Sequence, residues 1–199
     1  KKRGGQTMLN RSLILIGMPG CGKSTVGKVL AKKLGCGFLD TDSLIKKKTN
    51  ESLQETLDKH GKKYFTDIER EVLLELNPSE PLVIATGGSV ILYPDAMMHL
   101  GEIGMIIFLD ADLPLIRQRL WNVDTRGIIF SDNVTGESQE DSTIELLESD
   151  SSMTDKDELF DLYREREPLY FKYMDIRVHV RSKSVNQIVT EIIQGVERE

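Results

Sequence analysis

The chain has 199 residues and a formal net charge of −6, with 39% hydrophobic and 6% aromatic residues, which suits a single globular domain with a sizeable core. Its hydrophobic runs are too short to span a bilayer, and no sustained basic patch with interleaved aromatic residues indicates nucleic-acid binding, so we expect neither a membrane nor a nucleic-acid partner. The charge is uneven, because residues 131–158 hold ten carboxylates and one lysine, a net of −9, while the remainder of the chain carries +3.

Short hydrophobic strands alternate with amphipathic helices along the chain. The pattern predicts strands at residues 12–16, 37–39, 82–85, 105–109 and 176–180. It predicts helices at residues 22–34, 43–48, 53–76 (interrupted near Gly61), 94–100, 113–121, 156–173 and 185–196. Strands joined by such helices are parallel, which predicts an α/β fold: a doubly wound five-stranded parallel sheet with helices on both faces. Ligands bind such sheets at the carboxyl ends of the strands.

The segment after the first predicted strand is a complete G-x-x-x-x-G-K-[ST] phosphate loop, spanning residues 17–25. Its glycines let backbone N–H groups face phosphate oxygens, and the helix that follows adds its positive dipole end. Lys23 is expected to reach the β- and γ-phosphates, and the Ser24 hydroxyl to ligate Mg²⁺. The loop predicts a nucleoside triphosphate site on a P-loop NTPase fold, but it does not by itself separate a kinase from a GTPase or an ATPase. The further motifs favour the kinase form of this fold, like that of nucleoside monophosphate kinases. The residues expected to bind the nucleotide here are Gly20, Cys21, Gly22, Lys23, Ser24 and Thr25.

Two carboxylates, Asp40 and Asp42, follow the second predicted strand. If the strand persists, side chains two residues apart point to the same face, here towards the nucleotide crevice. One carboxylate would then hold the water shell of the metal, and the other would accept hydroxyl protons from a substrate. Asp42 or Ser43 also suits the N-cap of the next predicted helix, and the two roles are compatible if different residues perform them.

The acidic residues gather in a segment, 123–155, that shows little regular pattern. A stretch of more than about 12–15 residues without secondary structure is usually a functional lid or disordered, and both readings stay open. We expect residues 8–199 to form one domain with this segment as a lid or acidic insertion. Met8 suits a natural start, which makes residues 1–7 a leader or a cloning remnant.

Cysteine usage bears on the compartment. Cys21 and Cys36 show neither metal-ligand spacing nor a disulfide framework. A reducing, cytoplasmic location is therefore expected, and we expect the protein to be a monomer.

Taken together, these motifs resemble the shikimate kinase family. The resemblance covers residues 12–197 apart from the acidic segment. Its motifs are the phosphate loop with Val26-Gly27, Phe38-Leu39-Asp40-Thr41-Asp42, the Phe65…Glu69 helix, Ala85-Thr86-Gly87-Gly88, Arg119 and Arg126 at seven-residue spacing, and Arg166-Glu167-Pro168-Leu169-Tyr170.

The resemblance implies phosphoryl transfer from ATP, with Mg²⁺, to a hydroxyl of a small metabolite, most directly shikimate, forming shikimate 3-phosphate in aromatic amino-acid biosynthesis. It implies Lys23, Asp42 and Arg126 as catalytic residues, with Asp42 accepting the proton of the attacking hydroxyl and Arg126 closing over the phosphates. Arg119 would pack on the adenine. Ser24 and Asp40 would lie at the metal. The implied acceptor site is Asp42, position 66, Gly87, Gly88 and Arg166.

Three motifs depart from the family pattern. Thr66 stands where the F-R-x-x-E motif has its arginine, Ser89 replaces the third glycine of G-G-G, and the R-P-L lid motif reads Arg126-Gly127-Ile128. A threonine hydroxyl cannot make the bidentate bonds of a guanidinium to a carboxylate. We expect Lys62 or Lys63, on the preceding turn, to compensate in part. Two alternatives therefore stay open: a kinase of the same fold for another polyol or hydroxy acid, and an ATP-binding shikimate kinase-like protein without acceptor activity.

Overall fold

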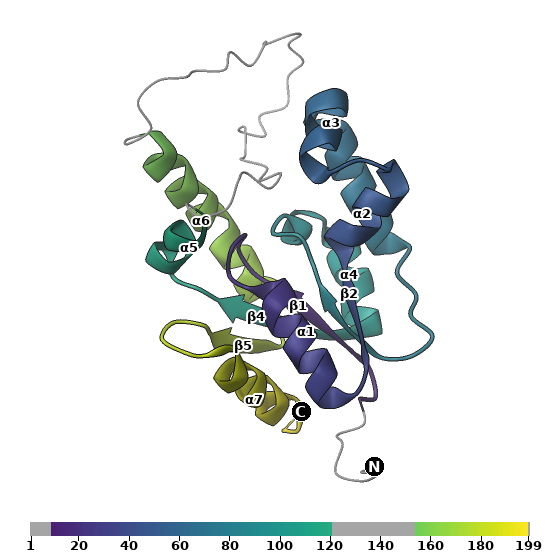
Figure 1. Cartoon of the computed structure of the whole chain (residues 1–199), viewed down its shortest axis with the longest axis vertical. Helices are drawn as coiled ribbons and strands as arrows, with labels where there is room; N and C mark the ends of the chain where they lie inside the picture. The colour runs from purple at the N-terminus through teal and green to yellow at the C-terminus, as the bar shows by residue number, and fades with distance from the viewer. Residues whose placement is uncertain (1–8, 121–153, 199) are drawn as a thin grey trace.

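Five parallel strands form one sheet in the order β2-β3-β1-β4-β5. They are β1 (Ser12–Ile16), β2 (Gly37–Asp40), β3 (Leu82–Ala85), β4 (Gly104–Asp110) and β5 (Ile176–His179). This computed structural model describes residues 9–120 and 154–198 (Figure 1). The predicted α/β fold is confirmed, since every strand pairing is parallel. β1 and β4 are buried along their whole lengths, as expected of central strands that helices cover on both faces.

Helices cover the sheet on both sides. They are α1 (Lys23–Leu34), α2 (Thr41–Thr49), α3 (Leu53–Leu74), α4 (Pro94–Ile103), α5 (Leu113–Leu120), α6 (Thr154–Tyr173) and α7 (Val185–Val196), with a 3-10 turn, η1, at Val90–Leu92. α1 and α7 pack together on one face, whereas α4 and α6 contact β4 on the other (Figure 1). Within the described part of the chain, no helix is both long enough and apolar enough to cross a membrane.

The strand register brings three connecting segments to one edge of the sheet. Leu15 of β1 and Asp40 of β2 both lie opposite Ala85, the last residue of β3. The chain therefore leaves β1, β2 and β3 at the same level. The phosphate loop of residues 17–25, the start of α2 and residues 86–89 meet at this carboxyl edge, where the fold predicts a ligand.

The boundary between β2 and α2 differs from its prediction. The strand continues through Asp40, and α2 begins at once at Thr41. Asp40 is the N-cap, because its Oδ1 accepts a hydrogen bond of 3.1 Å from the Asp42 N–H, so the prediction of Asp42 or Ser43 as the cap is wrong. Asp42 lies in the first helical turn, and the strand alternation expected to orient both carboxylates does not reach it.

The predicted interruption near Gly61 is confirmed. Gly61 has φ 78° and ψ 170°, and it divides α3 into two helical parts. The first part is fixed by a capping box, in which Ser52 and Glu55 satisfy each other's backbone N–H groups. The second part carries the buried face with Phe65 and Glu69 towards the sheet edge.

Candidate functional site

The phosphate loop joins β1 to α1 as predicted. Gly17, Gly20 and Gly22 all have positive φ, and Gly22 is the N-cap of α1 with φ 103°. Because Gly22 has no side chain, no cap bond occupies the first N–H groups of the helix. These N–H groups and the helix dipole are suited to an anion at this point.

Lys23 lies over this loop. Its side chain is buried, and its Nζ donates to the carbonyl oxygens of Gly17 at 2.7 Å and Met18 at 3.0 Å. The ammonium is therefore held beside the N-terminus of α1, where it adds a full positive charge to the partial charges of the backbone. This arrangement suits a polyphosphate chain.

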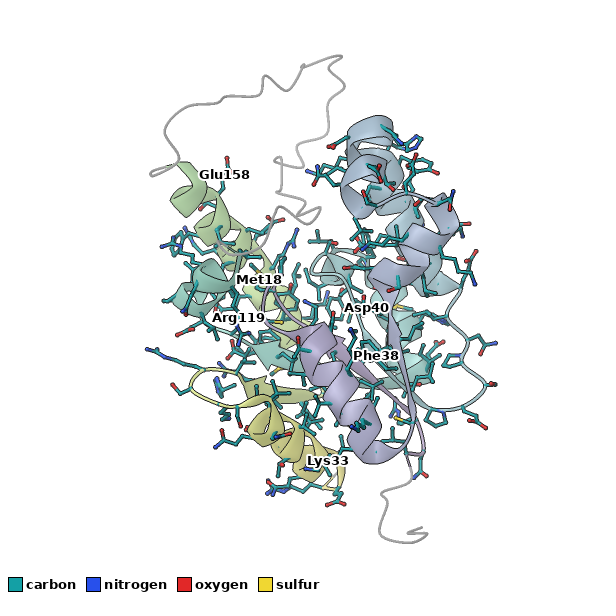
Figure 2. The ribbon with its side chains drawn as sticks, in the orientation of Figure 1. Met18, Lys33, Phe38, Asp40, Arg119 and Glu158 are labelled. Atoms are coloured by element: carbon teal, nitrogen blue, oxygen red, sulfur yellow. The ribbon has the colours of Figure 1, made fainter. Side chains whose placement is uncertain are left out.

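Arg119 of α5 contacts the loop further along the chain than Lys23 does. Its Nη1 donates to the carbonyl oxygens of Gly20 at 3.2 Å and Cys21 at 2.9 Å. In Figure 2, Arg119 and Asp40 lie on opposite sides of the loop that carries Met18. Arg119 thus borders the loop on the side of α5, and Asp40 borders it on the side from which α2 begins.

A hydroxyl and a carboxylate meet at the predicted metal position. Ser24 Oγ donates to Asp40 Oδ2 at 2.6 Å. These are the hard oxygen donors that Mg²⁺ prefers, and Mg²⁺ in nucleotide sites takes one or two protein ligands together with phosphates and waters. Among the described residues, no group of three or more His, Cys, Asp or Glu side chains able to hold a metal is found. The two side chains fit the predicted ion.

The turn after β3 lies between the phosphate loop and a pair of carboxylates. A Cβ on Gly87 would lie 2.2 Å from Glu69 Oε1 and 3.8 Å from Asp42 Oδ1. A Cβ on Gly88 would lie 2.6 Å from the Pro19 ring, and the Gly88 carbonyl accepts a bond of 2.6 Å from the Tyr170 hydroxyl. This turn therefore touches the phosphate loop on one side and the acidic pair on the other.

We predict that Gly87→Ala destabilises the protein by about 1–3 kcal/mol, because overpacking a well-packed site costs about that much. Glu69 is buried and its Oε2 accepts two hydrogen bonds, so moving Oε1 away from a methyl group placed 2.2 Å from it would disturb those bonds. Urea unfolding measures the change. Gly101→Ala in α4 is the matched control, since its Cβ meets nothing closer than 3.9 Å and it should be neutral or slightly stabilising. Equal stabilities of the two variants would contradict the prediction.

Arg166 of α6 is the buried cation of this region, with 1% of its surface exposed. Its positive charge acts to lower the pKa values of Glu69, Tyr93 and Tyr170, so it lies near these three residues. Tyr170, one turn after Arg166, stacks on Phe108 of β4 with ring centroids 5.0 Å apart. That stack and the bond from Tyr170 to Gly88 fix this part of α6 against the sheet.

Glu69 belongs to the same cluster, although the sequence singles it out only as part of a motif. The residue is 3% exposed. Ser89 Oγ donates to its Oε2 at 2.6 Å, and the Tyr93 hydroxyl donates to the same atom at 2.7 Å. Burial raises the pKa of Glu69 and the nearby Asp42 charge adds to this, while the two hydroxyl bonds and Arg166 act in the opposite direction.

Thr66 and Lys63 make their described polar contacts within their own helix. The Thr66 hydroxyl donates to the Lys63 carbonyl at 2.8 Å, within its own helix. Lys63, expected as a partial substitute for an arginine at position 66, has an exposed side chain that pairs with Asp67. Arg126 and the predicted lid up to residue 153 lie outside the described residues, and α6 begins at Thr154.

Comparison with known proteins gives a consistent result. A family model for shikimate kinase matches residues 19–197. A shikimate kinase of Prochlorococcus marinus (strain MIT 9211) is 33% identical over 198 residues, which cover 99% of this chain and 86% of that protein. One from Paracidovorax citrulli is 34% identical over 189 residues, covering 94% of this chain and 92% of that protein. Among solved structures, a shikimate kinase from Acinetobacter baumannii in complex with shikimate is similar, with a TM-score of 0.76 and 28% identity over 94% of this chain and 93% of that one.

Proposed function

Because this chain belongs to the shikimate kinase family, we propose that it transfers the γ-phosphoryl group of ATP to a hydroxyl of shikimate. The observation that carries the proposal is the position of the Gly87-Gly88 turn. Gly88 packs against Pro19 of the phosphate loop, and Gly87 packs against Glu69 beside Asp42. A donor bound at the loop and an acceptor bound at the carboxylates would therefore lie next to each other, as phosphoryl transfer requires.

On the donor side, the triphosphate lies along the phosphate loop. The N–H groups at the start of α1 bind its oxygens, and Lys23 neutralises the charge that develops as the phosphoryl group moves. Arg119, bonded to the loop at Gly20 and Cys21, is assigned to the adenine side. Arg126 is assigned to closure over the phosphates.

Ser24 and Asp40 are the residues that would hold Mg²⁺. When bound, the ion supplies positive charge to phosphate oxygens. In this chain Asp40 also caps α2 through the Asp42 N–H. The same carboxylate thus links the metal position to the backbone of the catalytic aspartate.

On the acceptor side, Asp42 and Arg166 carry the two recognition tasks. Arg166 pairs with the carboxylate of shikimate through its planar guanidinium. Asp42 accepts the proton of the attacking hydroxyl as that oxygen bonds to the γ-phosphorus and the bond to the bridging oxygen of ADP breaks. Gly87 and Gly88, which lack side chains, allow the acceptor to approach the backbone.

We also assign the enzyme to the cytoplasm, which the free thiols of Cys21 and Cys36 support.

A direct assay tests the proposal. ADP release is measured with the purified protein, ATP and Mg²⁺, with shikimate added or omitted, and with a panel of other polyols and hydroxy acids in its place. We expect release to depend on shikimate at millimolar concentration or below. Release that depends on another acceptor but not on shikimate would instead identify a kinase of the same fold with a different substrate.

Thr66 favours a weaker acceptor site and leads to a prediction. Thr66→Arg should lower the KM for shikimate by roughly tenfold or more, because a hydrogen bond to a charged group contributes about 1.5–3 kcal/mol and 1.4 kcal/mol is about tenfold in affinity. Steady-state kinetics with shikimate as the varied substrate measures this change.

Thr66→Lys is the matched control, since it adds the same charge without the planar fork. We expect the lysine variant to recover only a small part of the gain. If neither variant changes the KM, another group already binds the carboxylate or the acceptor is not shikimate.

A further inference from the structure

The carboxyl group of Glu69 is held by one short segment of the chain. Ser89 and Tyr93, which flank the 3-10 turn η1, both donate to Oε2, at 2.6 and 2.7 Å. The turn keeps their spacing, because Leu92 N donates to the Ser89 carbonyl at 2.9 Å and Tyr93 N to the Val90 carbonyl at 3.1 Å. Two hydroxyl groups at the ends of one short turn thus donate to the same atom, Glu69 Oε2.

The second oxygen of Glu69 is directed elsewhere. Oε1 packs directly against Gly87, since a Cβ there would lie only 2.2 Å away. Asp42 borders the same glycine, with its Oδ1 at 3.8 Å from the Cβ position. The two hydrogen bonds to Oε2 therefore fix where Oε1 lies relative to Gly87 and to Asp42.

Thr66, on the same helix as Glu69, does not supply either of these two hydrogen bonds. That position precedes Glu69 by about one turn on α3, where a donor would lie on the same helix face. Thr66 instead turns its hydroxyl back to the Lys63 carbonyl at 2.8 Å. The donors to Glu69 come from the segment after β3, which is also the segment that carries the Gly87-Gly88 turn.

The surroundings of Glu69 make these two hydrogen bonds important for its charge state. Glu69 is buried, and burial together with Asp42 favours its neutral form, whereas the two hydroxyl bonds favour the charged form. The charged form is the one that attracts the Arg166 guanidinium, which is itself buried. Losing one hydroxyl donor would leave the buried Oε2 with a single hydrogen bond and weaken the hold on both Glu69 and Arg166.

We propose that Ser89 and Tyr93 are positioning residues for the acceptor: their hydroxyls fix Glu69, and Glu69 in turn holds Arg166 and the Gly87 turn where the acceptor binds. The inference rests on the proposed function for the identity of the acceptor. We call this chain of contacts, from the two hydroxyls to the Glu69 carboxylate and on to the Arg166 guanidinium, the relay. It requires no bound substrate.

Kinetics of Ser89→Ala and Tyr93→Phe test the relay. Each change removes one hydroxyl with little loss of volume. We expect each to raise the KM for shikimate by about fivefold, and the double variant by more than tenfold, with the KM for ATP unchanged within about twofold. In a Glu69→Gln background, where the carboxylate is absent, adding Tyr93→Phe should change the KM by less than about twofold.

Tyr163→Phe is the matched control. Its hydroxyl donates to Glu167 Oε1 at 2.8 Å, so the variant breaks a bond of the same type elsewhere on α6. We expect unchanged kinetics. The positioning role is overturned if Ser89→Ala and Tyr93→Phe match this control, or if they lower the melting temperature and kcat without a selective rise in the KM for shikimate.

A spectroscopic readout separates failure of the inference from failure of the proposed function. The Nε–H resonance of Arg166 is recorded by NMR without any substrate. It is assigned as the signal that disappears in Arg166→Lys. We expect it to shift in Ser89→Ala and Tyr93→Phe and to stay in place in Tyr163→Phe. A shift in a protein that does not phosphorylate shikimate would refute the proposed acceptor and keep the relay, whereas no shift would refute the relay even in an active enzyme.

Discussion

The Asp42→Asn variant is expected to lose about 10²–10⁴-fold in kcat for shikimate phosphorylation, the range that a positioned general base contributes. The amide has the same shape as the carboxylate but cannot accept the proton of the attacking hydroxyl. Asp42 lies in the first turn of α2, and its backbone N–H is held by Asp40, so the substitution leaves the local backbone in place. Shikimate-dependent ADP release measures the loss.

ATP binding should survive this change, because the phosphate loop is untouched. Asp161→Asn, at an exposed carboxylate of α6, is the control for a lost negative charge and should retain full activity. An Asp42→Asn enzyme with more than a tenth of the normal kcat would show that another group takes the proton. Tolerance of the variant in a protein that binds ATP but phosphorylates no acceptor would favour the non-catalytic alternative.

Lys23→Met is expected to lower kcat/KM for ATP by about 10²–10³-fold or more, the usual cost of removing a group that stabilises transition-state charge. The methionine side chain is of similar length but carries no charge. The carbonyls of Gly17 and Met18 also lose their donor, so a decrease of about 1–3 kcal/mol in stability should accompany the kinetic effect.

Thermal shift with ATP separates the two effects, since a ligand raises the melting temperature only as far as it binds the folded state. We expect a shift for the wild type and little or none for Lys23→Met at the same ATP concentration. Lys32→Met, on the exposed side of the same helix, should behave as the wild type does. A normal ATP shift with normal kcat/KM in Lys23→Met would contradict the assignment of this lysine to the phosphates.

The donor side of the site is predictable from the sequence because its residues are neighbours in the chain. The phosphate loop is one contiguous motif between a buried strand and an amphipathic helix. The continuous hydrophobic runs of β1 and β4 indicate strands at the centre of the sheet, where both faces are covered. Asp40 illustrates where this reasoning ends. Its place after a hydrophobic strand is readable, but its role as the cap of α2 depends on where the helix begins, a boundary that pattern alone leaves open by a few residues.

The acceptor side depends on contacts between distant parts of the chain. Glu69 comes from α3, and Ser89 and Tyr93 follow β3. Ser89 stands out in the sequence only as a missing glycine, and nothing in the local pattern marks Tyr93. Apart from the Phe65…Glu69 motif, the signal for Glu69 is a charged residue at helical spacing from the buried Phe65, because a carboxylate on a buried helix face needs partners.

The Gly87-Gly88 turn has a thermodynamic consequence. It contacts Pro19 of the phosphate loop and Glu69 of the acceptor side, and neither contact leaves room for a methyl group. A displacement of the turn by one bound substrate must therefore alter the surface offered to the other. Linkage then requires that ATP change the affinity for the acceptor by the same factor by which the acceptor changes the affinity for ATP, so the two dissociation constants form a closed cycle that calorimetry can measure from either direction.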